Sequence, residues 1–203
     1  MISGVGCHPG ERSAVAAYNR AAFAARAQTT ALVGEVGLDA GSAVSAADQR
    51  RVFADVLEVV RAMPRLLSLH SVRAHKPLLD LLQTAKVPGA VLHWWTGSDA
   101  ETSRANGFGC WFSVGPGMVG NLDRLARFPR GRVLTETDAP ARGAVAGRVD
   151  DVEAVLAKVW KCDIEDVRRQ IWLNFGALVD ATGTEPLLPP AVQRLLAGVR
   201  API

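Results

Sequence analysis

Acidic and histidine side chains recur at the ends of short apolar runs in this sequence. Glu35 stands in LVGEVGLD, His70 in LSLHSVR, His93 in VLHWWTGS and Asp138 in TETDAP. Taken singly, each histidine has an ordinary alternative as a hydrogen-bonded core residue, and Asp138 as a turn residue. Glu35 is harder to explain, because a buried carboxylate without a cationic partner is costly or takes up a proton. Together, these side chains are the ligands of a divalent metal site.

Six apolar runs are the predicted strands that position these residues. They do not alternate in polarity, which is typical of parallel strands covered on both faces. The predicted strands are residues 2–7, 31–36, 66–70, 90–94, 109–114 and 133–136. Active sites of parallel α/β folds form at the carboxyl ends of the strands. We therefore expect the four side chains to meet at one edge of a parallel sheet.

Amphipathic stretches between these runs predict helices, so the chain reads as successive βα units. The predicted helices are residues 11–28, 46–63, 74–84, 100–105, 122–128, 149–160, 163–181 and 190–199. No linker or repeat divides them, which predicts one domain over residues 1–203. Six strands fit either an open doubly wound sheet or an incomplete eight-stranded barrel, since a complete (β/α)8 barrel typically takes ~250 residues.

Composition and charge are those of an ordinary globular protein. The 203 residues are 49% hydrophobic and carry a net charge of +3, which favours a solvated surface over a nucleic-acid-binding stripe. Three widely spaced cysteines without a CxxC motif argue against a disulfide framework and predict a cytoplasmic protein. No apolar run approaches the ~20 residues of a membrane span, and no leader peptide is recognisable.

Five segments in this order resemble motifs of the TatD family of metal-dependent deoxyribonucleases: GCHP, GEVGLD, LHSVR, HWWTGS and TETDAP. The resemblance extends from His8 to about residue 179. HWWTGS and GCWFSVGPGMV are most similar to the branch found in the Qat anti-phage defence cluster. The resemblance implies a TIM-barrel (β/α)8 fold with a metal site at the carboxyl face. It also implies a DNA substrate, single-stranded or trimmed from 3′ ends, and other subunits of a defence complex as partners.

The resemblance also implies roles for the four residues. Glu35 would bridge one or two divalent ions (Mg²⁺, Mn²⁺ or Zn²⁺), and His70 and His93 would complete the protein shell of one of them. Asp138 would ligate the other ion and orient or deprotonate the attacking water, so Glu35 and Asp138 are the predicted catalytic residues.

Two further residues are predicted to meet substrate. His8, in the GxHP position, would line the site, although a loop-stabilising hydrogen bond explains it equally well. Arg73, in the HxR position, would contact phosphate, and a surface salt bridge is its equal alternative. Trp94 and Trp95 could stack on a base or pack in the core, and we expect one to face each way. The loop 141–148 could touch the DNA backbone.

The sequence departs from the family at its beginning. The family opens with a strand carrying His-x-His, whereas MISGVGCHPG corresponds to the third strand of the family barrel. We therefore expect a barrel lacking its first two βα units, with unpaired edges at residues 2–7 and 133–136. A gene model starting at an internal methionine, a natural inactive fragment, and completion by another chain all explain this.

Two other functions stay open on the sequence alone. The chain could be a truncated, weak or inactive subunit, because the metal held by Asp138 lacks its His-x-His ligands. It could also be a metal-dependent hydrolase of small amides or esters, since related barrels carry that chemistry.

Overall fold

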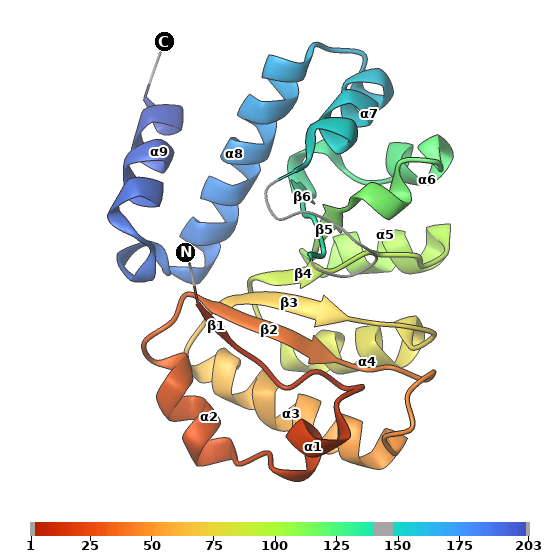
Figure 1. Cartoon of the computed structure of the whole chain (residues 1–203), viewed down its shortest axis with the longest axis vertical. Helices are drawn as coiled ribbons and strands as arrows, with labels where there is room; N and C mark the ends of the chain where they lie inside the picture. Colours follow the sequence, from red (N-terminus) through yellow and green to blue (C-terminus); the bar gives the residue numbers. More distant parts are fainter. Residues whose placement is uncertain (1–2, 140–147, 202–203) are drawn as a thin grey trace.

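Six parallel strands form one sheet in the computed structural model, which describes residues 3–139 and 148–201 (Figure 1). The strands are β1 (Gly4–Val5), β2 (Leu32–Gly37), β3 (Leu66–His70), β4 (Ala90–Leu92), β5 (Trp111–Val114) and β6 (Val133–Thr135). Each strand pairs with the next one in chain order, from β1 at one edge to β6 at the other. This singly wound order is that of a TIM barrel and excludes the doubly wound alternative for these strands.

Helices follow the strands as predicted. They are α1 (Arg12–Ala16), α2 (Arg20–Ala27), α3 (Ala46–Ala62), α4 (His75–Ala85), α5 (Asp99–Gly107), α6 (Leu122–Ala126), α7 (Asp150–Trp160), α8 (Ile164–Thr182) and α9 (Pro190–Arg200). Short 3-10 turns lie at η1 (Pro116–Met118), η2 (Arg130–Arg132) and η4 (Glu185–Leu187). The prediction of one helix over residues 11–28 is wrong. Asn19 has an extended backbone and its side chain accepts a hydrogen bond from the Ala22 N–H, so it starts α2 as a new helix.

The two faces of the sheet pack against different helices. Along β3, Leu67 and Leu69 are fully buried in the larger core, which includes α2 to α7. Leu66, on the opposite face, packs in a second cluster with residues of α8 and α9. Alternation along the strand places Ser68 and His70 on the same face as Leu66. In Figure 1 α8 and α9 lie near the beginnings of the strands.

The same division recurs along β5. Phe112 and Val114 belong to the larger core, whereas Trp111 packs with the α8 and α9 cluster. Ser113 is buried on the same face as Trp111, one step nearer the carboxyl end. The face is thus apolar where the strands begin and polar where they end.

Glycine permits a close approach of β2 to β3 beside His70. Gly37 has a φ of +139°, and a Cβ at this position would lie 2.1 Å from the His70 carbonyl oxygen. The neighbouring Leu38 N–H donates to the same oxygen at 3.0 Å. A side chain at residue 37 would therefore push the end of β3 away and displace His70.

Two further predictions concern membrane-spanning segments and domain organisation. Within the described ranges, no helix is long and apolar enough to cross a membrane. The single domain over residues 1–203 stays a prediction.

Candidate metal centre

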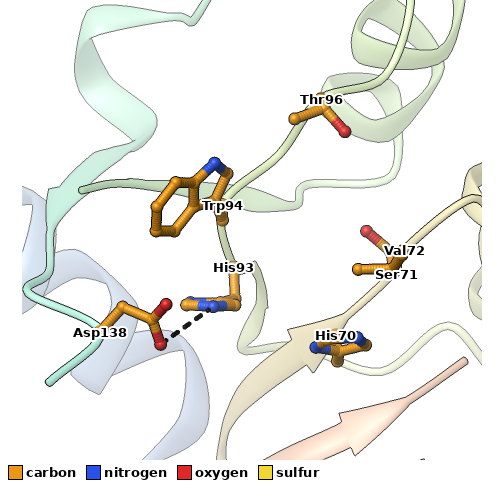
Figure 2. A pocket seen from close by; sticks show the side chains of 7 residues that line it. All are labelled: His70, Ser71, Val72, His93, Trp94, Thr96 and Asp138. Carbon is orange, nitrogen blue, oxygen red and sulfur yellow. Dashed lines mark ion pairs between the residues drawn. The ribbon is translucent and has the colours of Figure 1, made fainter. Parts of the chain in front are cut away.

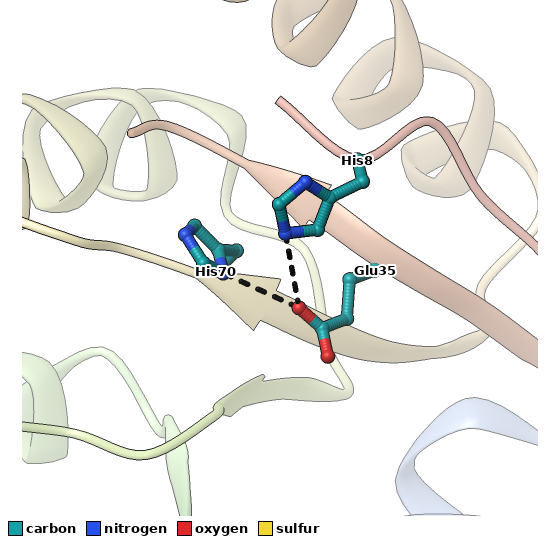
Figure 3. A group of neighbouring side chains, drawn as sticks. All are labelled: His8, Glu35 and His70. Atoms are coloured by element: carbon teal, nitrogen blue, oxygen red, sulfur yellow. Dashed lines mark hydrogen bonds and ion pairs between the residues drawn. The ribbon is translucent and has the colours of Figure 1, made fainter. Parts of the chain in front are cut away.

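Glu35, on β2, lies among three histidines: His70 at the end of β3, His93 after β4, and His8 in the segment that follows β1. Figure 3 shows Glu35 with His8 and His70. The pairing of β2 with β3 is irregular between Val33 and Val36, and such bulges re-aim side chains beside active sites. Glu35 Oε2 lies 3.3 Å from His70 Nδ1 and 3.6 Å from His8 Nε2, and Glu35 Oε1 lies 3.7 Å from His93 Nε2. The hydrogen bond with His70 lowers the pKa of Glu35 despite its burial, so it is a carboxylate at neutral pH.

His93 presents one ring nitrogen to this cluster and uses the other to hold its orientation. Its Nδ1 lies 2.6 Å from Glu136 Oε2, and because a carboxylate only accepts, Nδ1 carries the proton. In the neutral ring, Nε2 keeps its lone pair, and it faces Glu35 and, at 3.6 Å, Asp138 Oδ1 (Figure 2). A carboxylate behind a histidine is the usual support of a metal-binding imidazole.

His70 has a carboxylate at each of its two ring nitrogens. Nε2 lies 3.2 Å from Asp39 Oδ2, and Nδ1 lies 3.3 Å from Glu35 Oε2. A neutral imidazole has a single N–H, so it can satisfy one of these acceptors. A cation bound beside the second, unprotonated nitrogen would satisfy the carboxylate that receives no hydrogen bond. His70 therefore resembles His93, with Asp39 as the orienting carboxylate and Nδ1 turned to Glu35.

His8 is arranged as a hydrogen-bond donor. Its Nδ1 accepts a hydrogen bond from the Gly10 N–H at 3.0 Å, so a neutral ring carries its proton on Nε2. Burial, with the nearby His70, lowers the pKa of His8 and keeps the ring neutral at neutral pH. The Nε2–H points towards Glu35, at the edge of the site. The loop hydrogen bond expected for His8 is present, and its predicted contact with substrate stays a prediction.

The nitrogen and carboxylate oxygen atoms of this cluster are suitable ligands for a divalent cation. Two groups have ligand atoms that all lie within 4.8 Å of one another: His8, Glu35 and His70, and Glu35, His93 and Asp138. Both include Glu35, so its carboxylate could bridge two ions. In the part of the chain that the structure describes, no lysine or arginine forms an ion pair with Glu35, Asp39 or Glu136. Negative charge thus gathers around nitrogen lone pairs, which is the environment of a metal centre.

The grouping differs in one respect from the ligand set that the motifs imply. That set places His70 and His93 on one ion with Glu35. In the structure His70 groups with His8, and His93 groups with Asp138, on either side of Glu35. The assignment of ligands to individual ions stays a prediction.

Comparison with known proteins identifies the chain. The model of TatD-related DNases matches residues 1–180. The chain belongs to the TatD family. It is 34% identical over 151 residues to the 3′-5′ ssDNA/RNA exonuclease TatD of Cronobacter sakazakii, covering 68% of this chain and 57% of that protein. It is 29% identical over 119 residues to the human deoxyribonuclease TATDN3, covering 55% and 43% respectively. The chain spans about half the length of these curated relatives.

Two solved structures share the fold of this chain. The Escherichia coli TatD homologue YJJV superposes with a TM-score of 0.72 at 22% identity, over 86% of this chain and 75% of that one. An uncharacterised amidohydrolase from Saccharomyces cerevisiae superposes with a TM-score of 0.68 at 14% identity, over 86% and 79%. These likenesses confirm the TIM-barrel-like fold.

Three contributors to the TatD site carried no assigned role in the sequence. Asp39 and Glu136 orient His70 and His93, and both stand inside the quoted motifs GEVGLD and TETDAP. Their presence beside the predicted ligands was the available signal, but the pairing of each acid with its histidine depends on strand register. The third contributor, Ser113, donates a hydrogen bond from its hydroxyl to Glu136 Oε2 at 2.6 Å.

The remaining predicted contacts lie around the same opening. Arg73 is exposed in the turn between β3 and α4 and forms no ion pair within the described residues, so the salt-bridge alternative loses support there. Trp95 is fully buried, whereas Trp94 lines the cavity beside the metal centre, as the prediction of one facing each way requires. Residues 141–147 of the predicted DNA-contacting loop lie outside the described residues.

The proton on His93 is expected to compete with the metal. Burial alone would lower the pKa of His93, but the hydrogen bond with Glu136 and the charges of Glu35 and Asp138 raise it to about 8. Divalent metal affinity should therefore rise between pH 6.5 and about 8, by up to about tenfold per unit, and then level off. Calorimetric titration of the chelator-treated protein with Mn²⁺ across this range measures it.

The metal-free fold should show the opposite dependence. Because the folded pKa exceeds the unfolded value near 6.5, protonated His93 contributes about 2 kcal/mol of stability below that pH. This contribution is lost as the pH rises through about 8. Urea denaturation in EDTA tests this pH dependence of stability, with His93→Gln as the variant that should lose it.

For the calorimetric titration with Mn²⁺, a metal affinity that does not change with pH would contradict the assignment of His93 as a ligand.

Proposed function

We propose that this protein is a divalent-metal-dependent hydrolase that cleaves DNA phosphodiester bonds, acting on single-stranded DNA or on 3′ ends. One observation carries the proposal: Glu35 lies between His70 and His93, and each histidine is oriented by a carboxylate of its own. The printed functions of relatives support the substrate class, since they include a 3′-5′ ssDNA/RNA exonuclease and a deoxyribonuclease.

The residues divide the work of such a site between them. A bound divalent ion supplies Lewis acidity towards a phosphoryl oxygen and lowers the pKa of water. Glu35, His70 and His93 would hold the ion, which would be Mg²⁺, Mn²⁺ or Zn²⁺, bound singly or as a pair. Asp138 lies beside His93 Nε2 at 3.6 Å, where its carboxylate can orient a water and accept its proton.

Two further side chains are suited to the phosphate. The neutral His8 ring has its Nε2–H directed towards the site and can donate to a phosphate oxygen. Arg73 stands exposed in the turn that follows His70 and brings positive charge to the same edge of the sheet. Both contacts would act on the substrate and leave the ion to the central residues.

A nuclease assay tests the proposal directly. A 5′-labelled single-stranded oligonucleotide is incubated with the 203-residue chain and Mn²⁺ or Mg²⁺, beside the same strand annealed in a blunt duplex. We expect a ladder of products shortened from the 3′ end, faster on the single strand, that EDTA abolishes and added metal restores. Persistence of cleavage in EDTA would mean a contaminating or metal-independent activity and would reject the proposal.

A catalytically weak or inactive subunit is the alternative. It is supported by the two strands at the edges of the described sheet, β1 and β6, which could pair with further chain. In the same assay this alternative predicts metal binding without cleavage. Hydrolysis of small amides or esters, tested with chromogenic esters, is a third possibility for a TatD-like barrel.

The wider role is also a proposal. Similarity of HWWTGS and GCWFSVGPGMV to the Qat branch supports a function in anti-phage defence together with other subunits. A cytoplasmic location is supported by the cysteines, since Cys7, Cys110 and Cys162 are all free.

A further inference from the structure

Two adjacent tryptophans leave the end of β4 in opposite directions. Trp95 is fully buried, and its Nε1–H donates to Thr102 Oγ1 at 2.9 Å. Trp94 instead lines the cavity beside the metal centre. Its backbone has a φ of +43°, a left-handed conformation that bulky residues rarely adopt, and its N–H donates to Glu136 Oε1 at 3.2 Å. The carboxylate that orients His93 therefore also holds the backbone that presents Trp94.

The indole of Trp94 has a defined backing. A Cβ built on Gly117 would lie 2.1 Å from Trp94 Cζ2 and 2.3 Å from Cη2, so the ring lies directly against the η1 backbone. The absence of a side chain at Gly117 makes room for the ring there. Its orientation relative to the site is fixed too, with ring centroids of Trp94 and His93 6.4 Å apart and planes inclined by 67°. A ring held in this way presents a preformed surface to the cavity.

The cavity in front of Trp94 has the size and chemistry of a base-binding site. It encloses about 300 Å³, at the lower end of the range of small-molecule sites. Figure 2 shows Trp94 near His93 and Asp138. Val72, just after β3, lines the same cavity and is 43% exposed, so its apolar side chain is accessible to a ligand. Thr96, at the rim, is held by a hydrogen bond with His75 Nε2 at 3.1 Å.

We propose that Trp94 is a stacking platform for the base of the 3′-terminal nucleotide, with Val72 flanking the base on the other side. The inference rests on the proposed nuclease function and gives it a substrate class. Every base has a π-face, so stacking on Trp94 accepts all four bases. A base in a duplex is paired and already stacked, so the platform takes an unpaired end. The site thereby selects for single strands without reading sequence.

A binding experiment separates this role from catalysis. The probe is a 5′-fluorescein oligonucleotide whose last linkage is a methylphosphonate, which resists hydrolysis, ending in either a normal nucleotide or an abasic residue. Fluorescence anisotropy in Mn²⁺ compares the wild type with Trp94→Asn, Trp94→Phe and Val72→Thr. Asparagine tolerates the left-handed backbone and removes the ring, whereas phenylalanine keeps an aromatic face. Thermal melting of each variant confirms that it is folded.

We expect the wild type to bind the normal end about 5- to 150-fold more tightly than the abasic end. Trp94→Asn should bind both ends equally, with the affinity that the wild type has for the abasic end. Trp94→Phe should keep most of the difference, and Val72→Thr should lose part of it. Equal binding of the two ends by the wild type, or a loss in Trp94→Asn that is the same for both, overturns the platform.

The outcomes also separate the platform from the nuclease proposal. Cleavage of single strands by a wild type that does not discriminate between the ends rejects the platform alone. Discrimination without cleavage supports the platform and rejects the nuclease activity. A wild type that binds neither oligonucleotide rejects both.

Discussion

Glu35→Gln is expected to lower the rate of single-strand cleavage by at least about 10³-fold and to remove measurable Mn²⁺ binding. The Glu35 carboxylate faces His8, His70 and His93, and it belongs to both groups of side chains that could hold an ion. Glutamine keeps the shape but loses the charge, so a cation at this position loses its central anionic ligand. A bound ion contributes several kcal/mol of transition-state stabilisation, and 4 kcal/mol corresponds to roughly a thousandfold in rate.

The measurements are kcat/KM on a labelled single strand and calorimetric titration with Mn²⁺. Glu165→Gln, an exposed glutamate on α8 whose side chain is 81% exposed, is the matched control and should behave as the wild type. Melting temperature in EDTA shows whether the metal-free variant is folded. Cleavage that survives Glu35→Gln within tenfold of the wild type would place the chemistry elsewhere on the molecule.

Glu136→Gln is expected to weaken metal binding by about 10- to 100-fold while leaving every predicted ligand in place. Glu136 acts on the predicted metal ligands through hydrogen bonds. Its Oε2 accepts one from His93 Nδ1 and one from Ser113 Oγ, each at 2.6 Å. The neutral amide no longer makes His93 a more basic ligand. With its oxygen in the place of Oε2, its N–H₂ group faces the Trp94 N–H, which loses its acceptor. The pKa of His93, now about 8, should therefore fall.

Two companion variants distinguish orientation from general damage. Ser113→Ala removes one donor to Glu136 and should weaken Mn²⁺ binding less than Glu136→Gln does. Asp39→Asn makes the equivalent change behind His70, where Nε2 lies 3.2 Å from Asp39 Oδ2, and should match the effect of Glu136→Gln. The readout that a structural role would not move is the His93 titration, followed by NMR of the ring protons in EDTA. An unchanged titration in Glu136→Gln would show that Glu136 does not tune His93.

Several features of the fold follow from local sequence. Apolar runs such as the leucine-rich 66–70 predict buried parallel strands because both faces of these strands are covered, and β3 has the predicted bounds. Ser45 caps α3 by accepting from the Asp48 N–H, as its position before the amphipathic stretch indicates. The error at residues 11–28 has a local cause too, since the side chain of Asn19 competes for the backbone and restarts the helix.

The sequence by itself determined which side chains gather at the site. Glu35, His70, His93 and Asp138 lie in or just after β2, β3, β4 and β6. The carboxyl ends of parallel strands share one end of the sheet, so the proximity of these residues follows from chain order. The tertiary structure alone decided what each nitrogen and oxygen faces. Strand register pairs Glu136 with His93 and Asp39 with His70, and a left-handed residue backed by Gly117 turns Trp94 into the cavity. These contacts join residues up to 43 positions apart. Each depends on side-chain angles, and on distances that must be right to within a few tenths of an ångström, which the spacing of residues along the chain does not encode.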